Sequence, residues 1–161
     1  RRNRGKRITH EHMAYRTLLI PLIVAVLAQV VKLGIDRVRG NLNVKNLWLS
    51  YGGMPSAHSA FAVSAATSAG LADGWTSPLF AVAVVVSLII MRDAMTFRNF
   101  MGHQARLLNR LARLLPDEQG DEIPRLHEQI GHTPAQVLVG AVFGVLATLL
   151  LHILFGLAES R

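Results

Sequence analysis

Apolar side chains along this chain gather into four long runs, which polar and charged stretches separate. The runs cover residues 17–38, 57–72, 78–98 and 134–157. A helix needs about 20 predominantly apolar residues to cross the hydrocarbon core of a bilayer. The fourth run meets this length without interruption, and the first and third meet it if their polar ends lie at the interface. The pattern predicts an all-α, polytopic integral membrane helix bundle with about four transmembrane helices.

The second run is the least hydrophobic, because Ala and Ser make up much of it. It would not span a membrane alone, so we expect the other three helices to shield it. Small residues recur at four-residue spacing in this run and in the fourth, at Ala60, Ser64, Ser68, Gly140 and Gly144. Such residues let helix backbones approach closely in lipid. Both stripes therefore predict helix–helix contacts.

Between the third and fourth runs, the hydrophobic pattern changes from continuous to periodic. Apolar residues recur at helical spacing at Phe97, Phe100, Met101, Leu107, Leu108, Leu111, Leu114 and Leu115. The arginines of this stretch fall largely on other faces. The pattern predicts an amphipathic helix lying along the membrane surface, and Pro116 ends it.

Composition and charge agree with a membrane protein. The chain has 161 residues, the length of one domain, and 51% of them are hydrophobic. The net charge of +7 comes from basic residues outside the apolar runs, which favours contact with anionic lipids. No base-stacking motif accompanies the arginines, so nucleic acid is not an expected partner. The absence of cysteine excludes disulfides, thiolate zinc sites and cysteine nucleophiles.

We expect residues 1–16 to form a basic tail and residues 17–158 to form a single membrane-embedded domain. The first residue is Arg rather than Met, which indicates a fragment or a trimmed chain. The tail and first run look like a signal peptide, but they lack a clear small-residue cleavage site and Lys32 follows directly, so we expect a retained helix with a proline kink near its start at Pro21. Basic residues lie on both sides of the bundle, so the charge pattern does not orient it.

Charged residues gather at the ends of two predicted helices. Lys32 and Arg39 lie two helical turns apart near the end of the first, so they can share a face. Arg92, Asp93 and Arg98 lie at the end of the third. If the helices alternate in direction, these ends meet the beginnings of the second and fourth helices on one side of the membrane.

Those two beginnings carry helix caps and histidines. Ser56 is a good N-cap, and His58 follows in the first turn of the second helix. Thr133 and Pro134 form a natural start for the fourth helix, and His132 comes just before them. Helix N-termini attract anions through free N–H groups and the helix dipole. The four ends therefore predict an anion site, and phosphate is the anion that fits so many cations.

The two histidines add chemistry to that site. One imidazole can attack phosphorus, and the other can protonate the departing oxygen. Cations would stabilise the charge on the phosphoryl oxygens, and the glycines at positions 52 and 53 allow close backbone approach. The residue types therefore favour phosphoryl transfer.

Three short motifs resemble those of the type-2 phosphatidic acid phosphatase superfamily, which includes bacterial acid phosphatases and vanadium haloperoxidases. Lys32 and Arg39 match its first motif, the residues PSAH at 55–58 match its second, and His132 matches the histidine of its third. Gln136 stands where the third motif has an aspartate.

The chain resembles the superfamily's divergent membrane branch of small proteins more closely. The blocks GGMPSAHSA, RDAMTFRNFMGHQARLLN and GHTPAQVLVG carry this likeness, which covers about residues 28–145. Gly40 replaces the proline of the first motif, and Leu126 stands where the superfamily has an arginine. Arg92 and Arg98 look like the arginines that replace it in the divergent branch.

The resemblance implies a role for each matching residue. His132 would be the nucleophile that forms a phosphohistidine, and His58 would be the general acid. The groups that would hold the phosphate are Lys32, Arg39, Arg92 or Arg98, Ser56, and the backbone near Gly53 and Ala57. The implied activity is metal-independent and cofactor-free hydrolysis of lipid phosphates or isoprenoid diphosphates. The expected partners are this substrate and membrane lipids, and a homodimer stays open.

Gln136 departs even from the divergent branch, which normally carries a carboxylate there. Its amide oxygen can accept the Nδ1–H of His132 and fix the tautomer, but it supplies no negative charge for an imidazolium. We hypothesise that Asp93 supplies that charge, because an acid near a helix end in lipid usually has a partner. Two alternatives stay open, an inactive relative that binds anionic lipid headgroups or a partner, and a small transporter component.

Overall fold

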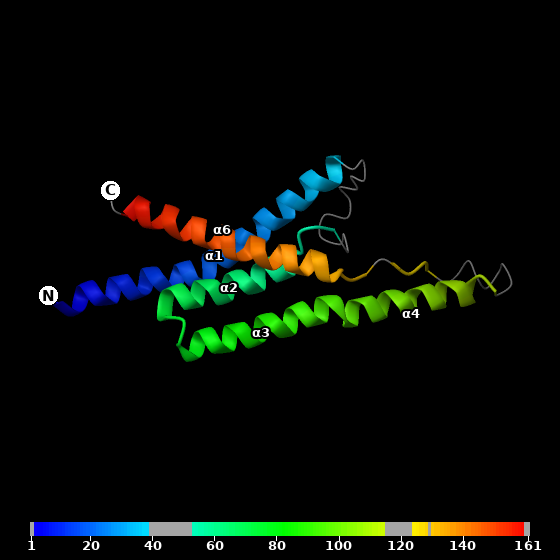
Figure 1. Ribbon diagram of the computed structural model, residues 1–161, viewed down its shortest axis with the longest axis horizontal. Helices are drawn as coiled ribbons and strands as arrows, with labels where there is room; N and C mark the ends of the chain where they lie inside the picture. Colours follow the sequence, from blue (N-terminus) through cyan, green and yellow to red (C-terminus); the bar gives the residue numbers. More distant parts are fainter. Residues whose placement is uncertain (1, 39–52, 115–123, 129, 160–161) are drawn as a thin grey trace.

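The chain folds into long helices that pack side by side (Figure 1). The computed structural model describes residues 2–38, 53–114, 124–128 and 130–159. The helices are α1 (Arg2–Val38), α2 (Ala57–Asp73), α3 (Pro78–Met95), α4 (Phe97–Ala112) and α6 (Pro134–Glu159). No strand occurs in these ranges, and the prediction of an all-α membrane helix bundle is confirmed.

The weakly hydrophobic helix α2 lies inside the bundle. Figure 1 shows it between α3 on one side and the crossing of α1 and α6 on the other. Its buried residues are nearly all small: Ser59, Ala60, Ala62, Ser64, Ala66, Thr67, Ser68, Ala69 and Gly70. The expectation that the other helices shield α2 is confirmed, and its small side chains explain why three neighbours can approach it.

One face of α1 supplies the apolar core. Ile20, Val24 and Ala28 recur every four residues and are fully buried, and they cluster with Ala60 of α2. Lys32 continues this stripe one turn further and is only 4% exposed. Since residues four apart share a helix face, the packing of α1 carries a cation into the end of the bundle.

The helix α1 begins earlier than the apolar pattern indicated. It starts at Arg2, so the helix runs through most of the predicted basic tail. Pro21 lies within it and is buried, and a proline there removes one backbone hydrogen bond and crowds the preceding turn. Figure 1 shows α1 changing direction where it passes behind α6, as expected for a helix interrupted in this way.

Close contact between α2 and α6 depends on glycine. A Cβ added at Gly144 would lie 2.6 Å from the carbonyl oxygen of Ala60, and one at Gly140 would overlap the carbonyl oxygen of Ser56. One turn further along, the hydroxyls of Ser64 and Thr148 form a 2.6 Å hydrogen bond. The two small-residue stripes therefore face each other, and the helix–helix contacts that each stripe predicted are present.

Three described stretches are long and apolar enough to cross a membrane: Tyr15–Arg37, Pro78–Ala112 and Pro134–Leu157. They leave many large apolar side chains exposed, which suits contact with lipid. The 17-residue helix α2 is not among them. The bundle therefore combines three candidate spans with one covered helix.

The amphipathic stretch forms α4, which a break at Thr96 separates from α3. Thr96 is both the last cap of α3 and the first cap of α4, so the helix pattern predicted for the third run ends at Met95 rather than at 98. The apolar face of α4 is exposed, with Phe100 at 64% and Leu111 at 59%. Figure 1 shows α4 running on from α3 in nearly the same direction. Its placement along the membrane surface stays a prediction.

Candidate active site

Two histidines meet where α2 and α6 begin. The ring centroids of His58 and His132 are 6.4 Å apart, with the rings tilted by 56°. The backbone N–H of Ser56 donates to the carbonyl oxygen of Gln136 at 3.2 Å, and Gly140 lets the two helices touch at this level. The contact between the helix starts is what brings together residues far apart in sequence.

The start of α2 is arranged to attract an anion. Ser56 is its N-cap, as predicted, and the Ser56 hydroxyl accepts hydrogen bonds from the N–H of Ser59 at 3.4 Å and from the Ser59 hydroxyl at 3.0 Å. Within the described residues, the N–H groups of Ala57 and His58 have no acceptor. Free amides at a helix N-terminus stabilise bound anions.

His132 is held at the start of α6 by a capping arrangement. Thr133 caps this helix as predicted, since its hydroxyl accepts from the N–H of Gln136 at 3.3 Å. In return Oε1 of Gln136 accepts from the N–H of Thr133 at 3.0 Å, which completes a capping box. The same Oε1 lies 3.3 Å from Nδ1 of His132.

This double contact determines the tautomer of His132. An atom that accepts from a backbone N–H must be the amide oxygen, and it can then only accept from the imidazole. The proton of His132 therefore resides on Nδ1. Nε2 is left with its lone pair, which is the state that a nucleophile requires.

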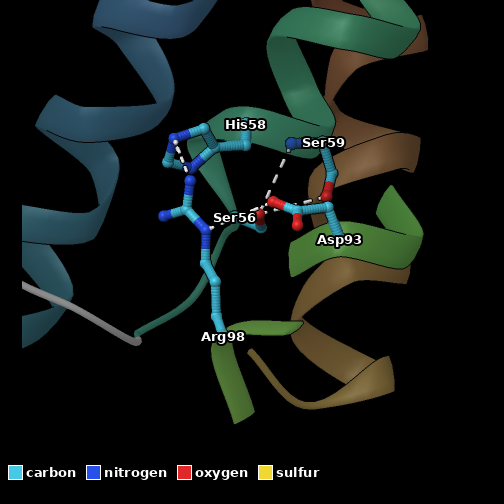
Figure 2. A network of polar contacts seen from close by, with 5 residues as sticks. All are labelled: Ser56, His58, Ser59, Asp93 and Arg98. Carbon is cyan, nitrogen blue, oxygen red and sulfur yellow. Dashed lines mark hydrogen bonds and ion pairs between the residues drawn. The ribbon is translucent and has the colours of Figure 1, made fainter. Parts of the chain in front are cut away.

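A charged side chain from α4 reaches the other histidine. Figure 2 shows the Arg98 guanidinium between the His58 ring and the Asp93 carboxylate. Nη2 of Arg98 lies 3.5 Å from Nε2 of His58, and its Nε lies 3.7 Å from Oδ2 of Asp93. The structure therefore places Asp93 beside Arg98 on the His58 side. Among the described groups that act electrostatically on His132, Asp93 is absent.

Lys32 reaches the site from α1 along a glycine. Gly53 has φ of +97°, and a Cβ added there would lie 2.6 Å from Cε of Lys32. Its positive charge acts on both histidines. Gly53 thus leaves the room that the buried lysine occupies beside the start of α2.

The remaining predicted phosphate ligands are not brought together in the same way. Arg92 lies at the end of α3 with an exposed side chain, and no hydrogen bond or ion pair joins that side chain to the described site residues. Arg39 lies outside the described residues. Arg98 and Lys32 are therefore the two predicted cations whose placement beside the histidines is described.

The surroundings lower the pKa of both imidazoles, and both histidines lie outside the three candidate spans. Burial is the main cause that lowers the pKa of His132 below its ordinary value of 6.5, and nearby positive charge adds to it, while the hydrogen bond with Gln136 opposes the shift. For His58, burial and then Arg98 lower the pKa, and Asp93 opposes them.

Two residues at the site were missed by the sequence analysis. Ser59 orients the capping hydroxyl of Ser56, and Nδ2 of Asn99 donates to the carbonyl oxygen of His132 at 3.4 Å. Ser59 directly follows His58, and Asn99 lies within the block that contains Arg98. Their place in these blocks was visible in the sequence, but their partners depend on how the helices pack.

Similarity to known proteins extends over most of the chain. The sequence profile of the divergent PAP2 family matches residues 13–147. A protein of Bacillus subtilis (strain 168) described as "Uncharacterized membrane protein YuiD" is 34% identical over 149 residues, which span 86% of this chain and 94% of that protein. No solved structure matches the chain significantly. The family match includes every residue of the site described above.

Proposed function

Because the chain belongs to the divergent PAP2 family and is a multi-pass integral membrane protein, we propose that it is a metal-independent phosphatase acting on a lipid-anchored phosphate. The observation that carries the proposal is the pair of imidazoles 6.4 Å apart, one of them with Nε2 free and Nδ1 held by Gln136. At this separation, both imidazoles could contact the same phosphoryl group.

In the first step, the lone pair on Nε2 of His132 attacks phosphorus. The new N–P bond forms as the P–O bond to the lipid alcohol breaks, and His58 gives its proton to the departing oxygen. The free amides of Ala57 and His58, with Lys32 and Arg98, stabilise the negative charge on the phosphoryl oxygens. This step yields a phosphohistidine and the free alcohol.

In the second step, water attacks phosphorus from the side that the alcohol left. His58, now neutral, takes the proton from that water, and the N–P bond breaks to return the lone pair to Nε2 of His132. Inorganic phosphate leaves, and His58 is again protonated. All bonds and protons are then restored for the next turnover.

Substrate binding also prepares His58 as an acid. The Arg98 guanidinium lies next to Nε2 of His58 and disfavours protonation of that imidazole. A phosphate anion competes for this guanidinium and adds negative charge, and both effects raise the pKa of the imidazole. Asp93 supports the protonated form through its charge, so we assign it to His58 rather than to His132.

The position of the site favours a substrate whose tail stays in the membrane. The histidines lie where the apolar helices end, and the neighbouring helix α4 exposes Phe97 at 66% and Phe100 at 64%. A headgroup at this level would enter the site while its chain remains among apolar side chains. Phosphatidate and isoprenoid diphosphates both have this form.

Phosphate release from vesicles tests the proposal. Purified protein should hydrolyse phosphatidate or farnesyl diphosphate equally well with and without a chelator. His132→Ala and His58→Ala should each lower turnover by about 10³-fold or more. A phosphoprotein that survives alkaline quenching but not acid, as expected of an N–P bond, should form in the wild type and not in His132→Ala. His103→Ala, which changes an exposed histidine on α4, serves as the matched control. Hydrolysis that persists in His132→Ala would contradict the mechanism.

A second candidate function is binding of anionic lipid headgroups without turnover, and Gln136 favours it. The amide fixes the tautomer of His132 but cannot stabilise a positive imidazole as a carboxylate would. Replacing it as Gln136→Glu separates the candidates. If the protein is an enzyme, the added charge should raise turnover by about tenfold. This is far less than the roughly 10⁴-fold loss of kcat that follows when the aspartate of a serine-protease triad is replaced by asparagine. If vesicle binding persists with no hydrolysis in either form, the binding function stands.

A further inference from the structure

The segment that carries His132 is fastened to α4 by an asparagine side chain. Nδ2 of Asn109 donates to the carbonyl oxygen of Leu126 at 2.9 Å, and Oδ1 of Asn109 accepts from the N–H of Leu126 at 3.0 Å. The same Nδ2 lies 2.9 Å from Oε1 of Glu128. Two opposed bonds to one residue fix the backbone in both position and direction, in the way that a neighbouring strand would.

The residues that lead up to His132 lie directly against the backbone of α4, as two glycines show. A Cβ added at Gly102 would lie 2.6 Å from the carbonyl oxygen of Glu128. A Cβ at Gly131, which has φ of +117°, would lie 2.9 Å from the backbone nitrogen of Asn99. These two glycines allow a closeness that no other residue would permit.

At the end of the segment, both backbone groups of His132 are bound to the α3–α4 region. Its N–H donates to the carbonyl oxygen of Ala94 at 3.1 Å, and its carbonyl oxygen accepts from Nδ2 of Asn99 at 3.4 Å. His132 is therefore held from two sides, by the Gln136 cap on α6 and by Ala94 and Asn99 of α3 and α4.

We propose that Asn109 and Asn99 are positioning residues that hold His132 at attacking distance from a bound phosphate. The inference rests on the proposed function for its catalytic meaning. Neither asparagine is bonded to His58, Lys32 or Arg98, so both act through the backbone of the segment. Misplacement of a nucleophile by about 1 Å can lower the rate about 10²-fold. Because the groups that bind the phosphate stay in place, we expect substrate binding to change little.

Asn109→Ala tests this directly, with Gln104→Ala as the control because Gln104 is an exposed amide on the same helix. We expect kcat for phosphatidate to fall about tenfold or more while KM changes less than about threefold, since only transition-state geometry is lost. Asn99→Ala should act in the same direction and provides the measurement if the first variant does not fold. A variant of either asparagine with unchanged kcat would overturn the proposal.

A readout that needs no activity separates this inference from the proposed function. The chain has no cysteine, so His58→Cys and His132→Cys can be introduced together and joined with a short bifunctional thiol reagent. Asn109→Ala in that background should slow cross-linking at least about fivefold if the asparagine positions residue 132. Slowed cross-linking, together with no phosphatase activity in the protein that keeps both histidines, would keep the positioning role and reject the proposed function. Unchanged cross-linking would reject the positioning role.

Discussion

At the scale of single residues, Gly53 and Lys32 depend on each other. The lysine is 4% exposed, and its side chain runs so close to the glycine that a Cβ added at Gly53 would displace the end of the lysine side chain. Glycine is also the residue that adopts the φ of +97° found there without strain. The position of the ammonium group is therefore determined by the absence of a side chain one helix away.

We expect Gly53→Ala to lower kcat/KM for phosphatidate by about 10- to 100-fold, because the methyl group would displace the ammonium group that we propose binds phosphate. Gly34→Ala is the matched control, since it adds a methyl group two residues from Lys32 where nothing lies within 4 Å. Steady-state kinetics on mixed vesicles measures both. If Gly34→Ala lowered kcat/KM as much as Gly53→Ala does, any methyl group near this end of α1 would be harmful. The loss in Gly53→Ala would then say nothing specific about the contact between Gly53 and Lys32.

The protonation states of the two histidines predict an acidic optimum. For kcat/KM, the proposed mechanism requires the free protein to have His132 neutral and His58 protonated, and the surroundings lower the pKa of each below 6.5. His58 therefore loses its proton as the pH rises through its lowered pKa, and His132 gains one as the pH falls through its own. The maximum of kcat/KM should lie below pH 6.5, with activity declining toward neutral pH.

A substrate with a good leaving group checks the assignment of that decline. Hydrolysis of p-nitrophenyl phosphate needs no proton for its leaving oxygen, so its kcat/KM should not follow the titration of His58. In His58→Ala the decline toward neutral pH should also disappear for phosphatidate. If the decline survives in this variant, it belongs to the substrate or to another group.

At the scale of elements, the site depends on the packing of α2 against α6. Both helix starts reach the same level because glycines on α6 face small residues on α2. The two N-termini can then share one anion, which a single helix start would bind more weakly. The geometry of the candidate site is in this sense a consequence of close helix packing.

Gly144→Ala should destabilise the protein by about 1–3 kcal/mol, because the added methyl group meets the backbone of α2 and cannot be accommodated without moving a helix. Gly156→Ala adds the same group in open space and should leave stability unchanged or slightly raised. Unfolding by SDS in mixed micelles measures both free energies. Equal stability of the two variants would contradict the packing described here.

At the scale of the whole molecule, the fold separates two ends. The turn between α2 and α3 lies at one end of the bundle, whereas α2 and α6 begin toward the other end, beyond which α4 extends (Figure 1). The candidate spans of α1, α3 and α6 connect these ends. The candidate site therefore lies at one end of these candidate spans.

Single cysteines test this arrangement, because the natural chain has none. Thr76→Cys, in the exposed turn after α2, and Arg113→Cys, just after α4, should react with an impermeant thiol reagent from opposite sides of oriented proteoliposomes. The bilayer blocks the reagent, so each cysteine should be protected on one side. Labelling of both from the same side would contradict a membrane-spanning α3.

The sequence by itself determined the elements and the residue types of the candidate site. Hydrophobic runs, the caps at Ser56 and Thr133, and the small-residue stripes are local features, and their physical consequences follow from spacing along a helix. The break at Thr96 was not predicted, because apolar residues continue across it. The early start of α1 was missed because polar helices carry no hydrophobic signal.

Only the tertiary structure decided which of these residues meet. Which histidine has Asp93 as a neighbour, which arginine reaches the site, and how Asn109 fastens the His132 segment depend on contacts between helices that are distant in sequence. These contacts require helix backbones to lie within a few ångströms of each other. They do so at glycines, where a single added methyl group would push the helices apart. Residue spacing specifies the face of each helix, but the partner across that face follows from the packing of the whole bundle.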